Sequence, residues 1–237
     1  MTTQYIRKAG LLRCINCKPV RFVQLFIFLI LVILLTPLLD RTPLLVALLS
    51  LFFLNILIVS LSFVGYSVRR RWPLIVMWLL VTLFDWAVLH IGNISAAMMI
   101  SIASDIIRAL LLIICVVLIL RYVLTSHEVT LDTIFGALVA YFLIALAFSA
   151  IYQAVDVFEP SSFSISGMTD GGYSESLKMQ FNYFSFVTIA TVGYGDIVPR
   201  LPMTQMLAIL EAVIGQFYMA GLITWLVSVF ARRGKGA

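Results

Sequence analysis

Residues 186–200 read FVTIATVGYGDIVPR, and two glycines near the middle of this stretch decide what its backbone can do. Successive carbonyl groups can face one side of an extended chain only when right-handed and left-handed backbone conformations alternate. Glycine reaches the left-handed region at little cost, and Gly193 and Gly195 occupy the positions where it is needed. We therefore expect residues 191–195 to form a short row of carbonyl oxygens that face the same way.

A row of inward-facing carbonyl oxygens can replace the water shell of a potassium ion. Residues 191–196, TVGYGD, resemble the selectivity filter of potassium channels. The resemblance implies that K⁺ is bound by the backbone carbonyls of four residues and by the side-chain hydroxyl of the first of them. These four residues are Thr191, Val192, Gly193 and Tyr194. It also implies that Val192 and Tyr194 turn their side chains outward against a pore helix and that Asp196 forms the outer mouth.

The composition indicates a chain that lives in a membrane. Hydrophobic residues make up 62% of the sequence and charged residues 11%, which excludes an ordinary soluble domain. Runs long enough to span a bilayer lie at 22–39, 44–67, 73–91, 98–123, 133–155 and 203–230. Residues 179–190 are too short to cross and are better explained as a re-entrant helix. The sequence thus predicts an all-α membrane protein with six transmembrane helices, one pore helix and one filter loop.

Residues 131–231 are similar to the pore module of tetrameric potassium channels. The stretch 131–156, LDTIFGALVAYFLIALAFSAIYQAVD, and the six-span layout resemble small bacterial six-transmembrane potassium channel proteins without a voltage-sensor signature. The resemblance implies an outer helix at 133–155, a turret at 156–178, a pore helix at 179–190, the filter at 191–196 and an inner helix at 203–230. The rest divides into an N-terminal segment 1–21, a four-helix domain 22–125 and a basic tail 232–237.

One filter per chain has a consequence for assembly. A K⁺ cage needs four carbonyls above and four below the ion, and a single chain cannot supply them. We expect a fourfold homotetramer with the pore on its axis. Phe184, Val187 and Thr188 of the pore helix are expected to support the filter. Phenylalanine packs but cannot donate a hydrogen bond, and Val187 stands where some relatives carry a glutamate, so the rigidity of the filter is left open.

The distribution of charge predicts the orientation, because Lys and Arg gather in short cytoplasmic segments. With the N-terminus inside, the cytoplasmic side receives most of the sixteen basic residues: Arg7, Lys8, Arg13, Lys18, Arg21, Arg69, Arg70, Arg71, Arg121, Arg232, Arg233 and Lys235. The net charge of +5 then reflects topology and does not imply nucleic acid. We expect a multi-pass protein of a bacterial cytoplasmic membrane with both termini in the cytoplasm, partnered by lipid and by copies of itself.

Several charged residues fall inside predicted spans. Asp85, Asp105, Arg108 and Glu211 form a candidate intramembrane charge network. For the first three, we favour a role that pins helices together over a role in gating. Glu211 is more consistent with structural hydrogen bonding behind the filter than with ion coordination. The fourth span carries Arg108 and, at its cytoplasmic end, Arg121. This predicts weak or absent voltage dependence, because sensor helices repeat basic residues every third position.

Gly215, in the middle of the last span, is a candidate gating hinge. Glycine inside a helix costs about 1 kcal/mol relative to alanine, so some other benefit should favour it. Close helix packing is an equally good explanation, and Gly221 is a rival hinge.

The sequence contains no catalytic constellation and predicts neither an enzyme nor a bound cofactor, with K⁺ as the permeant ion. Cys14 and Cys17 form a lone CxxC pair that we interpret as two free thiols in preference to a redox sensor. The predicted function is passive K⁺ conduction. A non-selective cation channel and a non-conducting regulatory subunit are the alternatives.

Overall fold

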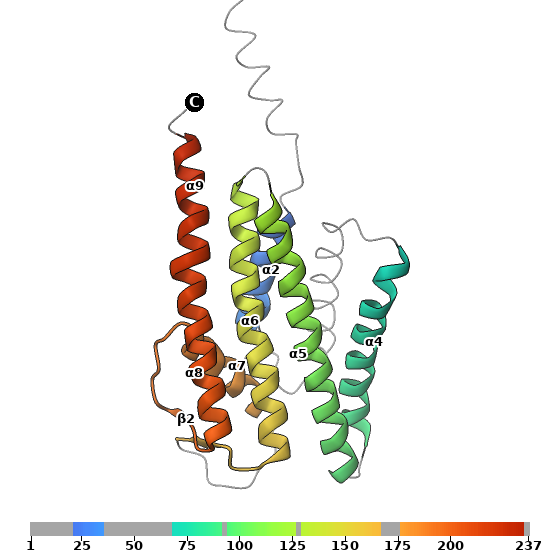
Figure 1. Cartoon of the computed structure of the whole chain (residues 1–237). Coiled ribbons are helices and arrows are strands. Elements are labelled where there is room, and N and C mark those ends of the chain that lie inside the picture. The colour runs from blue at the N-terminus through green and yellow to red at the C-terminus, as the bar shows by residue number, and fades with distance from the viewer. Residues whose placement is uncertain (1–20, 36–67, 92–93, 127–128, 167–175, 235–237) are drawn as a thin grey trace, which may run out of the picture.

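The computed structural model describes residues 21–35, 68–91, 94–126, 129–166 and 176–234 (Figure 1). In chain order the elements are α2 (Arg21–Leu35), α4 (Val68–His90), α5 (Ile94–Thr125), α6 (Leu131–Phe158), β1 (Phe163–Ile165), α7 (Ser176–Ile189), β2 (Ile197–Pro199), α8 (Pro202–Phe217), the π-helical segment η2 (Tyr218–Ile223) and α9 (Thr224–Gly234). The predicted span 44–67, the cysteines of the CxxC pair and parts of the turret and both termini lie outside the described residues.

Three helices of the described part are long and apolar enough to cross a membrane. They are α5 over Ser95–Thr125, α6 over Leu131–Phe158, and the joined α8, η2 and α9 over Pro202–Arg232. Shorter apolar helices cover Phe22–Leu35 and Trp72–Val88. The chain is therefore an integral membrane protein of mostly helical structure, as its composition predicts. The count of six spans and the fourfold assembly remain predictions.

The start of α6 is set by a pair of threonines. The Thr130 hydroxyl accepts the backbone N–H of Thr133, and the Thr133 hydroxyl accepts that of Thr130, each at 3.3 Å. This reciprocal capping satisfies donors that a helix start otherwise leaves free. Between them, Asp132 accepts the backbone N–H of Phe22 at 2.9 Å and so caps α2 as well. The helices α2 and α6 therefore begin at the same end of the molecule.

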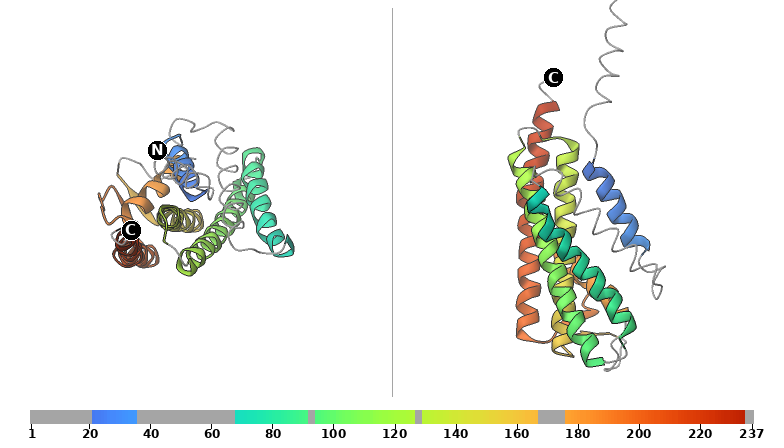
Figure 2. Two further views of the ribbon diagram at one scale, coloured as in Figure 1. Left: turned by 90° about the horizontal axis from the view of Figure 1, so that it is seen from above. Right: turned by 90° about the vertical axis from the view of Figure 1, so that its right-hand side faces the viewer.

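The main core lies between α2, α5 and α6. Leu25 and Leu29 of α2, Leu112 and Ile119 of α5 and Leu143 of α6 are all almost completely buried. Among these helices, α5 makes its most extensive contacts with α6. Seen along the helices, α4 lies at the side of the bundle away from α8 and α9 (Figure 2). Helices α2 and α5 thus support α6, the outer helix of the predicted pore module.

A two-stranded ribbon joins the turret to the segment after the filter loop. Strands β1 and β2 are antiparallel, with Phe163 opposite Pro199. The Phe163 ring packs edge-on against Tyr152 and Phe184, with ring centroids 5.5 and 5.4 Å apart. Phe163 thus buries residues 163–165 of the turret against α6 and α7. One aromatic residue is enough to bury this part of the loop, and three-residue strands leave little sequence signal.

The inner helix is interrupted by a π-helical turn. The sequence predicts one helix over 203–230, whereas η2 separates α8 from α9. At its start the Tyr218 hydroxyl donates to the Ala137 carbonyl oxygen of α6 at 2.7 Å. At its end the Thr224 hydroxyl donates to the Met219 carbonyl oxygen at 3.1 Å. These side-chain contacts stabilise a register that helical periodicity alone does not predict.

Candidate functional site

The loop after α7 has the alternating backbone expected from its glycines. Gly193 and Gly195 have φ angles of 58° and 78°, and Thr191 has 56°. Val192 and Tyr194 lie between them and are not among the residues with positive φ. Left-handed residues therefore occur at every second position from 191 to 195. The left-handed conformation of the two glycines is the one that the sequence predicts, whereas the left-handed conformation of Thr191 is not predicted by the sequence.

The conformation of Thr191 is explained by the way α7 ends. Its N–H donates to the Thr188 carbonyl oxygen at 2.9 Å, and the N–H of Val192 reaches back to the Val187 carbonyl oxygen at 2.9 Å. This is the hydrogen-bond pattern of a Schellman cap, with Thr191 at the left-handed position that glycine usually fills. A β-branched residue there costs about 1–2 kcal/mol. The cap joins the predicted filter loop directly to the last carbonyls of α7.

Helix α8 also contacts the predicted filter loop. Gln216 of α8 donates from Nε2 to the Thr191 hydroxyl oxygen at 3.0 Å. Gln216 is not among the residues that the sequence singles out, because its partner lies in another element. Its position next to Gly215 is the one signal that the sequence offers.

At the other end of the loop, Asp196 is held from three directions. The Tyr183 hydroxyl of α7 donates to Oδ2 at 2.7 Å, and the N–H of Ile197 donates to Oδ1 at 3.1 Å. The backbone N–H of Ser166, next to β1, donates to the Asp196 carbonyl oxygen at 2.8 Å. The hydrogen bond to Asp196 raises the pKa of Tyr183 to about 12. A tyrosine of α7 therefore supplies a donor to Asp196, the residue expected at the outer mouth.

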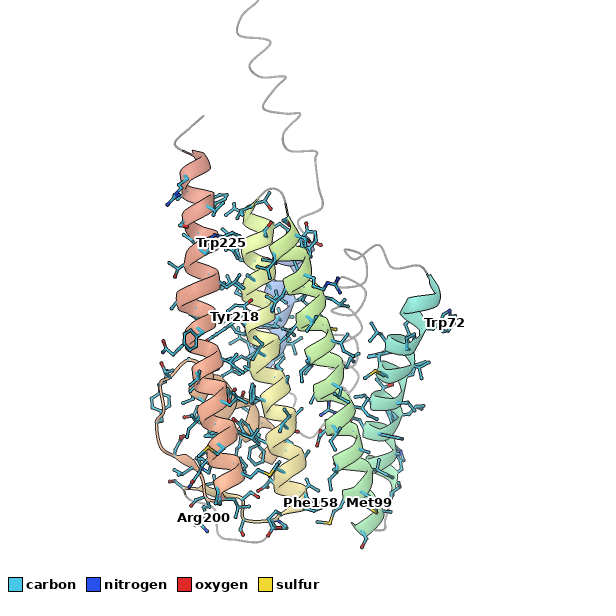
Figure 3. All side chains as sticks on the ribbon, in the orientation of Figure 1. Trp72, Met99, Phe158, Arg200, Tyr218 and Trp225 are labelled. Atoms are coloured by element: carbon cyan, nitrogen blue, oxygen red, sulfur yellow. The ribbon has the colours of Figure 1, made fainter. Side chains whose placement is uncertain are left out.

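The Tyr194 ring of the loop lies beside Tyr183 of α7. The rings of Tyr183 and Tyr194 are nearly parallel at 2°, with centroids 6.4 Å apart. Tyr194 and Val192 remain 71% and 53% exposed in one protomer. Arg200, just after β2, lies at the same end of the molecule as Phe158, and Trp225 lies toward the other end (Figure 3). The loop and its mouth therefore sit at one end of the helices.

This loop falls within a stretch that matches known proteins. Residues 137–232 match the family described as ion channel. Protein LctB of Geobacillus stearothermophilus is 31% identical over 104 residues, which cover 42% of this chain and 73% of that protein. Protein LctB of Bacillus caldotenax is 29% identical over 99 residues, with the same coverage. The chain belongs to the ion channel family. No solved structure matches it.

In this ion channel the three residues expected to support the filter act in different ways. Phe184 is buried against Tyr152, with ring centroids 5.2 Å apart. Val187 and Thr188 contribute backbone carbonyls to the cap described above. The prediction that these residues support the filter stays a prediction about function.

Gly215 of the channel is closely packed against the end of α7. A Cβ atom at this position would collide with the Ile189 carbonyl oxygen and would lie 2.7 Å from Ile189 Cγ1. The same carbonyl oxygen accepts a hydrogen bond from the Tyr141 hydroxyl of α6 at 3.0 Å. At Gly221, by contrast, an added Cβ meets nothing within 4 Å. Of the two explanations for Gly215, this geometry favours close packing over a hinge.

The predicted charge network is smaller than expected. Arg108 contacts Asp85 at 2.7 Å and Asp105 at 2.6 Å, and the Ser104 hydroxyl also donates to Asp85 at 2.9 Å. Glu211 does not join them. It is completely buried behind the pore helix, where the Tyr152 hydroxyl donates to its Oε2 at 2.7 Å and Ser185 bonds its Oε1. The predicted depth of these residues in the membrane could not separate the Arg108 cluster from Glu211, because depth does not say which faces of the helices meet.

Proposed function

We propose that this ion channel is a homotetramer that conducts K⁺ selectively and passively. The alternation of left-handed residues from Thr191 to Gly195 carries the proposal. This backbone allows the carbonyls of successive residues to face one side, which is what a dehydrated K⁺ requires. The bound ion is held by the carbonyls of residues 191–194 and by the Thr191 hydroxyl.

The outer surface of the inner helix supports assembly into a tetramer. Only 17% of the most apolar window of Pro202–Arg232 is buried in one protomer, compared with 56% for α6. Met206, Leu210 and Phe217 are among its large exposed apolar residues. In a membrane, an exposed face of this kind packs against copies of the chain, contacts lipid or lines the pore. Fourfold symmetry also supplies the four carbonyls that each ring needs.

Two observations support weak voltage dependence. The Arg108 guanidinium is bound by two carboxylates, so it is anchored in the helix bundle. In addition, only residues 126–130 separate the end of α5 from the start of α6. The two helices pack along each other. A charge that moved with α5 would therefore have to carry α6 with it.

The arrangement of the helices agrees with a cytoplasmic position for both termini. The start of α2 and the end of α9 lie at one end of the molecule, and the filter loop lies toward the other (Figure 1). Basic residues flank both of these helix ends, which indicates the cytoplasmic side. We place the protein in a bacterial cytoplasmic membrane, with its filter mouth facing outward.

Flux from liposomes containing the purified protein tests this function. We expect Ba²⁺-sensitive K⁺ flux and little Na⁺ flux. In one protomer, a Cβ at Gly193 meets nothing within 4 Å, so Gly193→Ala changes the backbone preference without a clash. A left-handed alanine costs about 1–2 kcal/mol in each subunit, so K⁺ flux should fall about tenfold or more.

Gly221→Ala is the matched control, since it also adds one methyl group without a clash. It should retain the ratio of K⁺ to Na⁺ flux. Equal Na⁺ flux in the wild-type protein would support a non-selective channel, and no flux from a correctly assembled tetramer would support a regulatory subunit.

A further inference from the structure

Glu211 is a fully buried carboxyl group that joins three helices. It is 0% exposed within a single protomer, so its burial does not depend on assembly. Its two oxygens contact Tyr152 of the outer helix α6 and Ser185 of the pore helix α7. Both partners are themselves 0% exposed. One side chain of the inner helix therefore connects the outer helix and the pore helix.

Counting hydrogen atoms indicates the form of this carboxyl group. Besides Glu211, the Ser185 Oγ also lies 2.6 Å from the Ala145 carbonyl oxygen. A carbonyl oxygen can only accept, and a serine hydroxyl has one hydrogen to donate. If Glu211 were ionised, that hydrogen could serve only one of its two acceptors. If Glu211 carries a proton, its O–H donates to Ser185, and Ser185 donates to Ala145, so every contact is satisfied.

The surroundings of the carboxyl group agree with a neutral form. In the described part of the chain, the ion pairs join Arg108 to Asp85 and Asp105, and no cation pairs with Glu211. The titratable side chains that interact with it from α6 are the phenols of Tyr152 and Tyr141. From α7, Tyr183 bonds Asp196 instead. A buried carboxylate without a cation is costly, whereas a hydrogen-bonded carboxylic acid avoids that cost.

We propose that Glu211 is a protonated carboxylic acid that positions the pore helix, and through it the filter loop. Its chain of hydrogen bonds runs from Tyr152 through Glu211 and Ser185 to Ala145. Ser185 lies in the last turns of α7, before the cap that holds Thr191. This inference rests on the proposed function for its effect on conduction. The protonated state itself does not depend on that function.

Infrared spectroscopy of the purified protein in lipid tests the protonated state directly. We expect the carbonyl stretching band of a protonated carboxylic acid at neutral pH, and we expect Glu211→Gln to remove it. An identical spectrum in this region for wild type and variant would overturn the proposal. The result stands even if the protein conducts no K⁺, so failure here is distinguishable from failure of the proposed function.

Flux and Ba²⁺ block then test the positioning role. Glutamine can reproduce the neutral arrangement, because its amide N–H donates to Ser185 and its amide oxygen accepts from Tyr152. Glu211→Gln should retain K⁺ selectivity and Ba²⁺ affinity at pH 7. Glu211→Ala and Ser185→Ala remove links in the chain and should weaken Ba²⁺ block about fivefold to tenfold.

Size-exclusion chromatography should first establish that each variant assembles. Loss of selectivity in an assembled Glu211→Gln protein would show that a charge is needed, and would contradict the proposal. Unchanged selectivity and block in an assembled Glu211→Ala protein would remove the positioning role. If Glu211→Ala does not assemble, Ser185→Ala and Glu211→Gln decide the matter, since both preserve most of the packing.

Discussion

Gln216 donates a hydrogen bond to the hydroxyl of Thr191 over 3.0 Å, so the inner helix touches the first residue of the filter loop. A movement of the inner helix would therefore displace the hydroxyl at the innermost ion site of the proposed filter. Neither residue alone indicates this link, because it depends on how α8 passes the end of α7.

Removing this donor should change the inner ion site. Gln216→Leu keeps a similar volume but leaves the Thr191 hydroxyl without its partner. A hydrogen bond of this kind contributes about 1 kcal/mol, so the affinity for intracellular Ba²⁺ should change about fivefold. Block measured in planar bilayers checks this value. Met206→Leu, an exposed substitution on the same helix, should leave block unchanged, and equal behaviour of the two variants would refute the link.

The two glycines of the inner helix should respond in opposite ways to alanine. Gly215→Ala forces a methyl group against the Ile189 carbonyl oxygen and should destabilise the protein by about 1–3 kcal/mol. Gly221→Ala has space within the protomer and should leave the stability unchanged or raise it by up to about 1 kcal/mol. Thermal unfolding of the two purified variants provides the comparison. A stable Gly215→Ala protein would mean that the helices pack less tightly than described.

The bond between Tyr183 and Asp196 should make the filter mouth sensitive to alkaline pH. The pKa of Tyr183 is raised from its ordinary value of 10.0 to about 12, so the bond is fully present below pH 10 and is lost as the pH rises through about 12. Current decay during sustained opening should accelerate within this range. Tyr183→Phe should decay faster at pH values below this range and should lack this alkaline transition. A transition that persisted in the phenylalanine variant would assign it to another group.

The Arg108 ion pairs should be structural. Arg108→Leu removes the guanidinium that bonds both Asp85 and Asp105, which should cost about 3 kcal/mol and reduce the yield of assembled protein. The slope of conductance against voltage should stay shallow in any Arg108→Lys protein that assembles. A steep wild-type slope that flattens in the lysine variant would contradict this account and indicate a moving charge.

Parts of this structure were accessible from the sequence because they depend on local chemistry. The left-handed Gly193 and Gly195 follow from the need to alternate the backbone, and the apolar helices follow from composition. The pairing of Arg108 with Asp105 follows from their spacing of three residues on one helix. In each case the feature depends on residues that are close in sequence or on the apolar surroundings of a membrane.

Other parts were not accessible because they depend on contacts between distant segments. Thr191 is left-handed because α7 ends in a cap there, although threonine normally avoids this conformation. The strands β1 and β2 are too short to have a pattern, and the turn η2 follows contacts such as that of Tyr218 with α6. The partners of Glu211 could be identified only once three helices were placed together.

The reversal potential of the purified channel, with K⁺ on one side of a bilayer and Na⁺ on the other, tests whether the pore selects K⁺. We expect a large reversal potential with the K⁺ side negative, and current that Ba²⁺ blocks. A reversal potential near zero, with Na⁺ carrying as much current as K⁺, would contradict the claim that residues 191–195 form a potassium filter.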